Sequence, residues 1–146
     1  MKSSEPVFAT SIAVRFGDCD PAGIVFYPRY FEMINNLVED WCAIGLGHSF
    51  RSLHMEQGLG LPTVHVETDF VAASELGEIL RAELVVKKMG SSSLTLDIRL
   101  SGPDQSIRVR CTIVLVMLDL QKRSAVRLPE LMRSRIARFC TAQSSA

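Results

Sequence analysis

Two hydrophobic patterns alternate along the chain, and the first of them predicts strands. Ile12, Val14 and Phe16 occupy alternate positions, which is the spacing of a strand with one buried face. Four further runs, rich in apolar and β-branched residues, are typical of strands: 63–71, 79–89, 93–100 and 106–118. Turn residues stand between consecutive runs at 90–92 and 102–104. Links this short join antiparallel neighbours, so the runs predict an antiparallel sheet.

The second pattern has the period of a helix and begins at Pro28, where a missing N–H costs little. Glycines at 45 and 47 favour an end near that point. The apolar residues on one side of this helix are Tyr30, Ile34, Leu37, Trp41 and Ile44, widened by Met33 and Val38. We expect shorter helices after Ser49, ending by Gly58, and at 129–139, and residues 143–146 should fray.

The simplest arrangement of these elements is a single α+β domain over residues 1–146. The apolar stripe of the long helix needs one apolar face of a sheet to cover it. We therefore expect a curved antiparallel sheet packed against one long helix. The run 108–118 has β-branched residues on both faces, so both faces should be covered, which favours a dimer: Val109, Ile113, Val114 and Val116.

Composition excludes several kinds of partner. The chain has 146 residues, a formal net charge of zero and a pI near 6.8, so we expect no nucleic-acid partner. Its first residues lack the apolar run of a signal peptide. No stretch approaches the roughly 20 apolar residues of a membrane-spanning helix. These features predict a cytoplasmic protein with no membrane partner.

The cysteines and histidines show no spacing typical of a metal site. The cysteines are widely spread and form no C-x-x-C pair, which favours free thiols in a reducing compartment. The histidines have no ligand spacing with the cysteines. We therefore expect neither a metal nor a cofactor. The residues concerned are Cys19, Cys42, Cys111, Cys140, His48, His54 and His65.

An acidic loop between the first strand and the long helix is the best candidate for chemistry. The first N–H groups of a helix have no internal partner, so they can polarise an oxygen while a carboxylate attacks or activates water. By themselves, Asp18 and Asp20 leave two interpretations open, since Asp is also a common turn and cap residue. The flanking carboxylates raise the thiol pKa of Cys19, which makes it a poor nucleophile.

Residues 16–25, followed by Tyr27-Pro28 and an aromatic-rich helix, closely resemble the opening of the bacterial 4-hydroxybenzoyl-CoA thioesterase family. More loosely, they are similar to the wider group of acyl-CoA thioesterases. The resemblance implies a hotdog fold, in which a curved antiparallel sheet wraps around one long helix. It also implies hydrolysis of an aryl-CoA thioester such as 4-hydroxybenzoyl-CoA, with Asp20 as nucleophile or general base. The backbone N–H of Tyr27 would hold the thioester oxygen, and its ring would pack half-buried at the helix entrance.

The same resemblance extends the site to substrate-binding residues. Asp18 would be a hydrogen-bonding partner within the loop, and small residues such as Gly23 would let the ligand approach the backbone. Basic residues would meet the CoA phosphates, and the family forms its sites between the subunits of a homodimer, here expected to pair again into a homotetramer. The further residues expected at the site are Val25, Phe26, His65, Lys87 and Lys88, with Phe31 and Met33 candidates for an aromatic-friendly pocket.

Other functions remain open at this stage. A short-chain aliphatic acyl-CoA is an alternative substrate, and a hotdog protein can also bind acyl-CoA without turnover. Dehydratases and hydratases of this fold use a His with an acid, and the segment 15–45 contains no His. The Asp-x-Asp pair also suggests Mg²⁺-dependent phosphoryl transfer, but that chemistry favours alternating strands and helices rather than consecutive strands.

Overall fold

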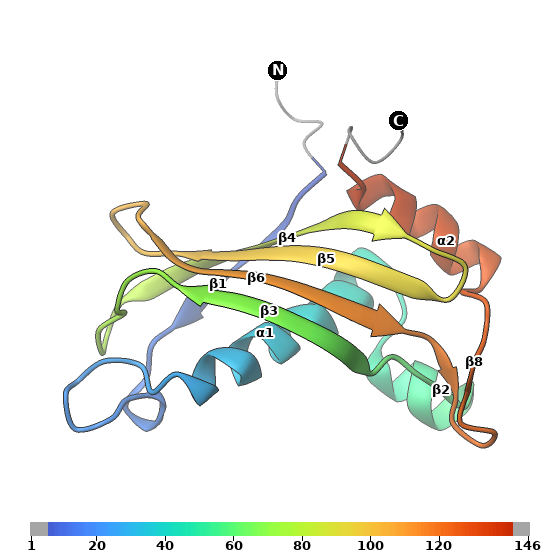
Figure 1. Cartoon of the computed structure of the whole chain (residues 1–146), viewed down its shortest axis with the longest axis horizontal. Helices are drawn as coiled ribbons and strands as arrows, with labels where there is room; N and C mark the ends of the chain where they lie inside the picture. Colours follow the sequence, from blue (N-terminus) through green and yellow to red (C-terminus); the bar gives the residue numbers. More distant parts are fainter. Residues whose placement is uncertain (1–5, 142–146) are drawn as a thin grey trace.

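The computed structural model describes residues 6–141, which form one antiparallel sheet over a long helix (Figure 1). The strands lie in the order β1-β4-β5-β6-β3, and every neighbouring pair is antiparallel. Their bounds are β1 (Phe8–Ala13), β3 (Thr63–Phe70), β4 (Ile79–Met89), β5 (Ser93–Ser101) and β6 (Ile107–Val116). Helix α1 (Pro28–Asp40) runs along one face of this sheet (Figure 1).

Smaller elements close the end of the sheet near the β4–β5 hairpin. Three two-residue strands form a second sheet: β2 (Leu59–Gly60), β7 (Leu118–Asp119) and β8 (Ser124–Ala125). Helix α2 (Glu130–Ile136) and the short helix η4 (Ala137–Phe139) follow, as the sequence predicts, and lie at that end (Figure 1). The helix expected after Ser49 is the turn η3 (Ser52–Glu56). The fraying expected at 143–146 lies outside the described residues.

The core lies between the sheet and α1, where the two predicted apolar patterns meet. Alternate side chains of β4 and β5 are buried, including Leu84 and Leu96, both without exposed surface. The helix contributes its apolar stripe, including Leu37 at 1% exposure. Burial of one such side chain stabilises the fold by roughly 1.5–3 kcal/mol. The predicted α+β arrangement is therefore the one the chain adopts.

Two predicted core residues are exposed. Phe16 is 84% exposed because β1 ends at Ala13 and the chain turns into the short helix η1 (Phe16–Asp18). Ile44 is 74% exposed because α1 continues as the π-helical turn η2 (Trp41–Gly45). The i→i+5 pairing of such a turn shifts the side chains off the helical stripe, and Leu46 is buried instead.

Strand β6 buries one face in the single chain, whereas the sequence predicts cover on both. Val109 and Ile113 point into the core, while Val114 and Val116 on the other face are partly exposed. The register of β6 against β5 also shifts near its start, where Leu100 faces Val109 and Ser101 faces Ile107. This shift is a β-bulge, and the residue between the two pairs, Arg108, therefore departs from the alternation of faces along the strand.

Candidate active site

Asp18 organises the loop between η1 and α1. Its Oδ2 accepts a hydrogen bond of 2.9 Å from the backbone N–H of Arg15. Its carbonyl oxygen accepts one of 2.9 Å from the N–H of Phe26, at the far end of the loop. Asp18 therefore closes the loop through both its side chain and its backbone.

Asp20 lies at the centre of the same loop and is partly exposed. Its Oδ1 accepts a 2.8 Å hydrogen bond from the N–H of Ala22, and its backbone pairs with Ile24 and Gly23. Gly23 has φ +81°, a conformation that other residues rarely adopt. Among residues 6–141, no hydrogen bond engages the second carboxylate oxygen, Oδ2. The turn thus orients Asp20 through one oxygen and leaves the other available.

The start of α1 supplies a hydrogen-bond donor on the same loop. Tyr27 precedes Pro28 in helical conformation, and its carbonyl accepts from Tyr30 N–H at 3.1 Å. No residue within the described part of the chain accepts a hydrogen bond from the Tyr27 N–H. This N–H lies at the positive end of the helix dipole, so it suits a developing negative charge on a carbonyl oxygen.

Aromatic side chains cluster beside this helix start. The ring of Phe70, at the end of β3, lies 5.8 Å from the rings of both Tyr27 and Tyr30 and 6.1 Å from that of Phe31. Phe26 contacts Tyr27 at 5.6 Å. Tyr27 is 58% exposed, so its ring is less covered than the half-buried ring predicted for it, and Phe70 is 47% exposed.

Sequence reasoning did not single out Phe70, because only the sheet brings the end of β3 to the start of α1. Met33 is 5% exposed, so it belongs to the core and not to this exposed aromatic cluster. Val25 is also buried, so it supports the loop from beneath, with its N–H donating to the carbonyl of Ser74 at 2.9 Å. The aromatic wall therefore consists of Phe26, Tyr27, Phe31 and Phe70.

Three predicted site residues lie away from Asp20 in the single chain. His65 is five residues from Phe70 along β3, about 16 Å at the usual rise of a strand. Its Nε2 lies 3.6 Å from Glu67 Oε1, on the same face of the strand. Lys87 and Lys88 are at the end of β4 opposite to the Asp20 loop (Figure 1).

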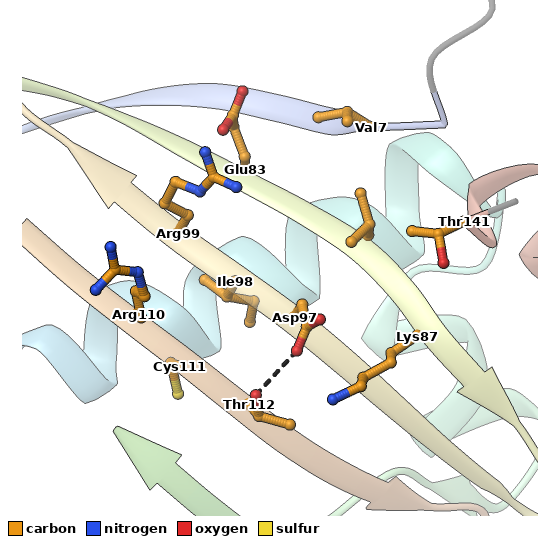
Figure 2. A pocket seen from close by; sticks show the side chains of 11 residues that line it. Val7, Glu83, Lys87, Asp97, Ile98, Arg99, Arg110, Cys111, Thr112 and Thr141 are labelled. Carbon is orange, nitrogen blue, oxygen red and sulfur yellow. Dashed lines mark hydrogen bonds between the residues drawn. The ribbon is translucent and has the colours of Figure 1, made fainter. Parts of the chain in front are cut away.

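A hollow of about 540 Å³ opens on the sheet face that α1 does not cover (Figure 2). Lys87 is one of its lining residues, together with Asp97, which accepts a 2.9 Å hydrogen bond from Thr112 Oγ1. Arg99 and Arg110 lie opposite each other on adjacent strands of the same face. Asp20 and Tyr27 do not line this hollow. The hollow is therefore separate from the acidic loop.

Within residues 6–141, the cysteines form neither a disulfide nor a metal cluster. All four cysteines are free, as the sequence predicts. Desolvation, with the carboxylates of Asp18 and Asp20, raises the pKa of the Cys19 thiol. Residues 6–141 contain no group of three or more His, Cys, Asp or Glu side chains arranged to hold a metal. No helix in that range is long and apolar enough to cross a membrane.

Several known proteins with similar sequences are named as thioesterases or as hydrolases of CoA thioesters. The thioesterase-like superfamily matches residues 14–136. A 1,4-dihydroxy-2-naphthoyl-CoA hydrolase of Synechococcus elongatus is 34% identical over 118 residues, 80% of this chain and 85% of the relative. A 4-hydroxybenzoyl-CoA thioesterase of Pseudomonas is 28% identical over 124 residues, covering 80% and 87%.

The fold agrees with these sequence matches. The crystal structure of a 1,4-dihydroxy-2-naphthoyl-CoA thioesterase from Synechocystis superposes with a TM-score of 0.82 at 23% identity, covering 90% of this chain and 96% of that one. The chain belongs to the thioesterase-like superfamily of hotdog proteins. The prediction that it is a hydrolase of acyl-CoA thioesters is thereby confirmed.

Proposed function

We propose that this chain hydrolyses the thioester of an aryl-CoA, with Asp20 as nucleophile or general base and the Tyr27 N–H as donor to the carbonyl oxygen. The observation that carries the proposal is the loop itself. One hydrogen-bonded turn holds an available carboxylate oxygen of Asp20, and the helix that follows begins with an N–H that no described residue engages. Thioester hydrolysis needs both groups.

Two routes use this arrangement. Asp20 can attack the carbonyl carbon, expel the CoA thiolate and form a mixed anhydride, which water then opens to the carboxylic acid. Alternatively, Asp20 can take a proton from a water molecule as that water attacks the carbonyl carbon; the tetrahedral intermediate then breaks its C–S bond, and the departing CoA thiolate takes the proton from Asp20. In both routes the carbonyl oxygen gains negative charge, which the Tyr27 N–H and the helix dipole stabilise.

An aryl acyl group fits the surroundings of the loop best. Phe26, Tyr27, Phe31 and Phe70 expose ring surface beside the helix start. Aromatic rings attract one another in stacked or edge-on contact beyond the effect of buried area. The relatives named above act on hydroxybenzoyl and dihydroxynaphthoyl thioesters, which are aryl groups. We favour this class over short aliphatic chains.

A homodimer completes the proposed site. Strand β3 is at the edge of the sheet and exposes Val64 (60%), Val66 (43%) and Phe70 (47%). Such an apolar edge is ready to pair with a second strand. Antiparallel pairing of two β3 edges would place His65 of the partner subunit near the Phe70 end of this one. Lys87 and Lys88 stay our candidates for the CoA phosphates.

The dimer has a direct test. Light scattering at micromolar concentration should report at least a dimer, and we expect the dimers to pair into a tetramer. Only monomer at that concentration would contradict the proposed assembly. The four free thiols support a reducing, cytoplasmic location for it.

The activity is tested by thiol release over a panel of CoA esters. The panel contains 4-hydroxybenzoyl, 1,4-dihydroxy-2-naphthoyl, benzoyl, short-chain and long-chain thioesters. We expect an aryl-CoA to give the highest kcat/KM. A clear preference for long aliphatic chains would contradict the aryl proposal. Binding without thiol release would indicate an acyl-CoA binding protein, and a change in enoyl absorbance without thiol release would indicate a hydratase.

A further inference from the structure

Arg108 is a buried arginine on β6 that the proposed chemistry does not use. It is 5% exposed, and it lies at the β-bulge between the pairs Leu100–Val109 and Ser101–Ile107. The bulge turns its side chain away from the outer face, where the next arginine, Arg110, is exposed. A sheet in regular register would put residue 108 on the face opposite to residue 109.

The Arg108 side chain binds the connection between β3 and β4 along much of its length. Its Nη1 donates to the carbonyl of Ala73 at 2.9 Å, to Ser74 Oγ at 3.3 Å and to Glu78 Oε1 at 2.7 Å. Its Nη2 donates to Glu78 Oε2 at 3.2 Å, which makes the ion pair bidentate. The planar guanidinium is suited to such a fork, because its N–H groups have fixed directions.

Arg108 makes further hydrogen bonds through its backbone carbonyl and to two more side chains. Its carbonyl accepts from the N–H groups of Val71 at 2.8 Å and Ala72 at 3.3 Å. Its Nε donates to Ser106 Oγ at 3.0 Å, and Nη2 also contacts Asp104 Oδ1 at 3.3 Å. One residue thus holds both ends of segment 71–78.

Segment 71–78 in turn holds the loop that carries Asp20. The N–H of Val25 donates to the carbonyl of Ser74 at 2.9 Å, and the N–H of Leu76 donates to the carbonyl of Gly23 at 3.0 Å. Ile24 and Glu75 form a β-bridge between these two bonds. The loop from Gly23 to Val25 is therefore paired, residue by residue, with the segment that Arg108 holds.

The same segment also reaches the first turn of α1. Ser74 has no exposed surface, and its Oγ accepts a 3.0 Å hydrogen bond from the hydroxyl of Tyr30. That oxygen is also a partner of Arg108. A single buried hydroxyl thus links the guanidinium to α1, the helix that begins directly after Tyr27.

We propose that Arg108 is a positioning residue, which acts through segment 71–78 to hold the Asp20 carboxylate and the Tyr27 N–H in register for attack on the thioester. This inference rests on the proposed function. Misplacement of reacting groups by about 1 Å can cost about 10²-fold in rate, even from a distant substitution. We call the contacts of Arg108 with segment 71–78 the clamp. Loss of the clamp should lower kcat and leave KM nearly unchanged, because the substrate contacts at the aromatic wall remain.

The test combines kinetics with amide hydrogen exchange in Arg108→Met. We expect kcat to fall about 10- to 100-fold with KM within about threefold. Without substrate, exchange should accelerate at the Val25 and Leu76 amides, whose hydrogen bonds to the carbonyls of Ser74 and Gly23 join segment 71–78 to the Asp20 loop, and stay unchanged at the buried centre of β5. Arg108→Lys keeps the charge without the fork, so it should recover only part of kcat.

Two further variants keep the test decisive. Arg81→Met removes an exposed arginine that bonds Glu83 at 2.9 Å, and it should leave both readouts unchanged. A Cβ at Gly102 would overlap the guanidinium of Arg108, so Gly102→Ala displaces that side chain without deleting it. If Arg108→Met fails to fold, Gly102→Ala and Arg108→Lys are measured in the same way, and we expect kcat to fall in both, less in Arg108→Lys than in Gly102→Ala.

The possible failures are distinguishable. Wild-type kcat and unchanged Val25 and Leu76 exchange in folded Arg108 variants overturn the positioning role. A purely structural role predicts that activity falls only in proportion to the fraction of protein that is folded. If kcat per folded molecule stays constant in this way, the positioning role is also overturned. Absence of thiol release by the wild-type protein contradicts the proposed function instead, and exchange then still decides whether the clamp exists.

Discussion

The two ends of the sheet are stabilised by different interactions. At the end that carries the Asp20 loop, a buried cation holds polar partners: Arg108 with Glu78, Ser74 and Asp104. In the smaller elements near the hairpin end, the fully buried side chains are apolar: Leu53, Met117, Leu128, Met132 and Ile136. Directional hydrogen bonds specify the positions of atoms, whereas apolar burial stabilises without direction.

This contrast predicts a division of labour between the ends. Substitutions at the hairpin end should lower the free energy of unfolding and leave the kinetics of the folded protein alone. Substitutions at the loop end should change turnover, or the dependence of stability on pH. The four predictions that follow test this division, from the largest expected effect to the smallest.

Asp20→Asn should give the largest effect, on turnover alone. The variant keeps an oxygen that accepts from Ala22 N–H, so the loop geometry survives, but it loses the nucleophile and base. We expect kcat to fall by about 10²–10⁴-fold or more, with little change in KM, in steady-state thiol-release kinetics. Asp18→Asn is the matched comparison, and its kcat should stay within about tenfold. An inactive, folded Asp18→Asn beside an active Asp20→Asn would reverse the two assignments.

Leu128→Ala should affect stability alone. Leu128 has no exposed surface, so its truncation leaves a cavity and should lower the free energy of unfolding by about 2–5 kcal/mol in denaturant titration. The control is Leu131→Ala, because Leu131 lies three residues further along the chain on α2, is 56% exposed and should change stability by less than about 0.5 kcal/mol. A kcat per folded molecule that drops with Leu128→Ala would break the division between the ends.

Glu78→Gln should change how stability depends on pH. The hydrogen bond from Arg108, followed by that from Glu75 N–H, lowers the pKa of Glu78 below its ordinary value of 4.5. A lowered pKa contributes stability above pH 4.5, and this contribution is lost as the pH falls through the folded-state pKa. As the pH falls, the free energy of unfolding should therefore decrease more steeply for wild type than for Glu78→Gln. Plotted against pH, the two free energies should converge in acid. Parallel curves in urea titrations from pH 7 to pH 3 would contradict the prediction.

Cys19→Ser should have the smallest effect. Cys19 sits between the two acids, but its thiol pKa is raised, so little thiolate is present at neutral pH. We expect kcat/KM for the preferred ester to stay within about twofold of wild type. A loss beyond tenfold in a folded protein would assign the thiol a role in the reaction.

Much of the fold was predictable because its signals are local. The bounds of β4 match the apolar run 79–89, and α1 begins at the predicted Pro28. The predictions that Phe16 and Ile44 are buried were wrong, because a 3-10 turn and a π-helical turn interrupt the regular spacing on which those predictions depend. Hydrophobic spacing assumes a regular helix or strand, so it fails where the backbone changes its hydrogen-bond pattern.

The sequence by itself determined most of the elements and the set of residues that meet in the loop. Asp18, Asp20, Gly23 and Tyr27 are within ten positions, so local hydrogen bonds bring them together. The tertiary structure decided which distant residues join them. Phe70 reaches the helix start through the sheet, and Arg108 turns inward only because β5 and β6 pair with a bulge, a property of two strands that neither shows alone.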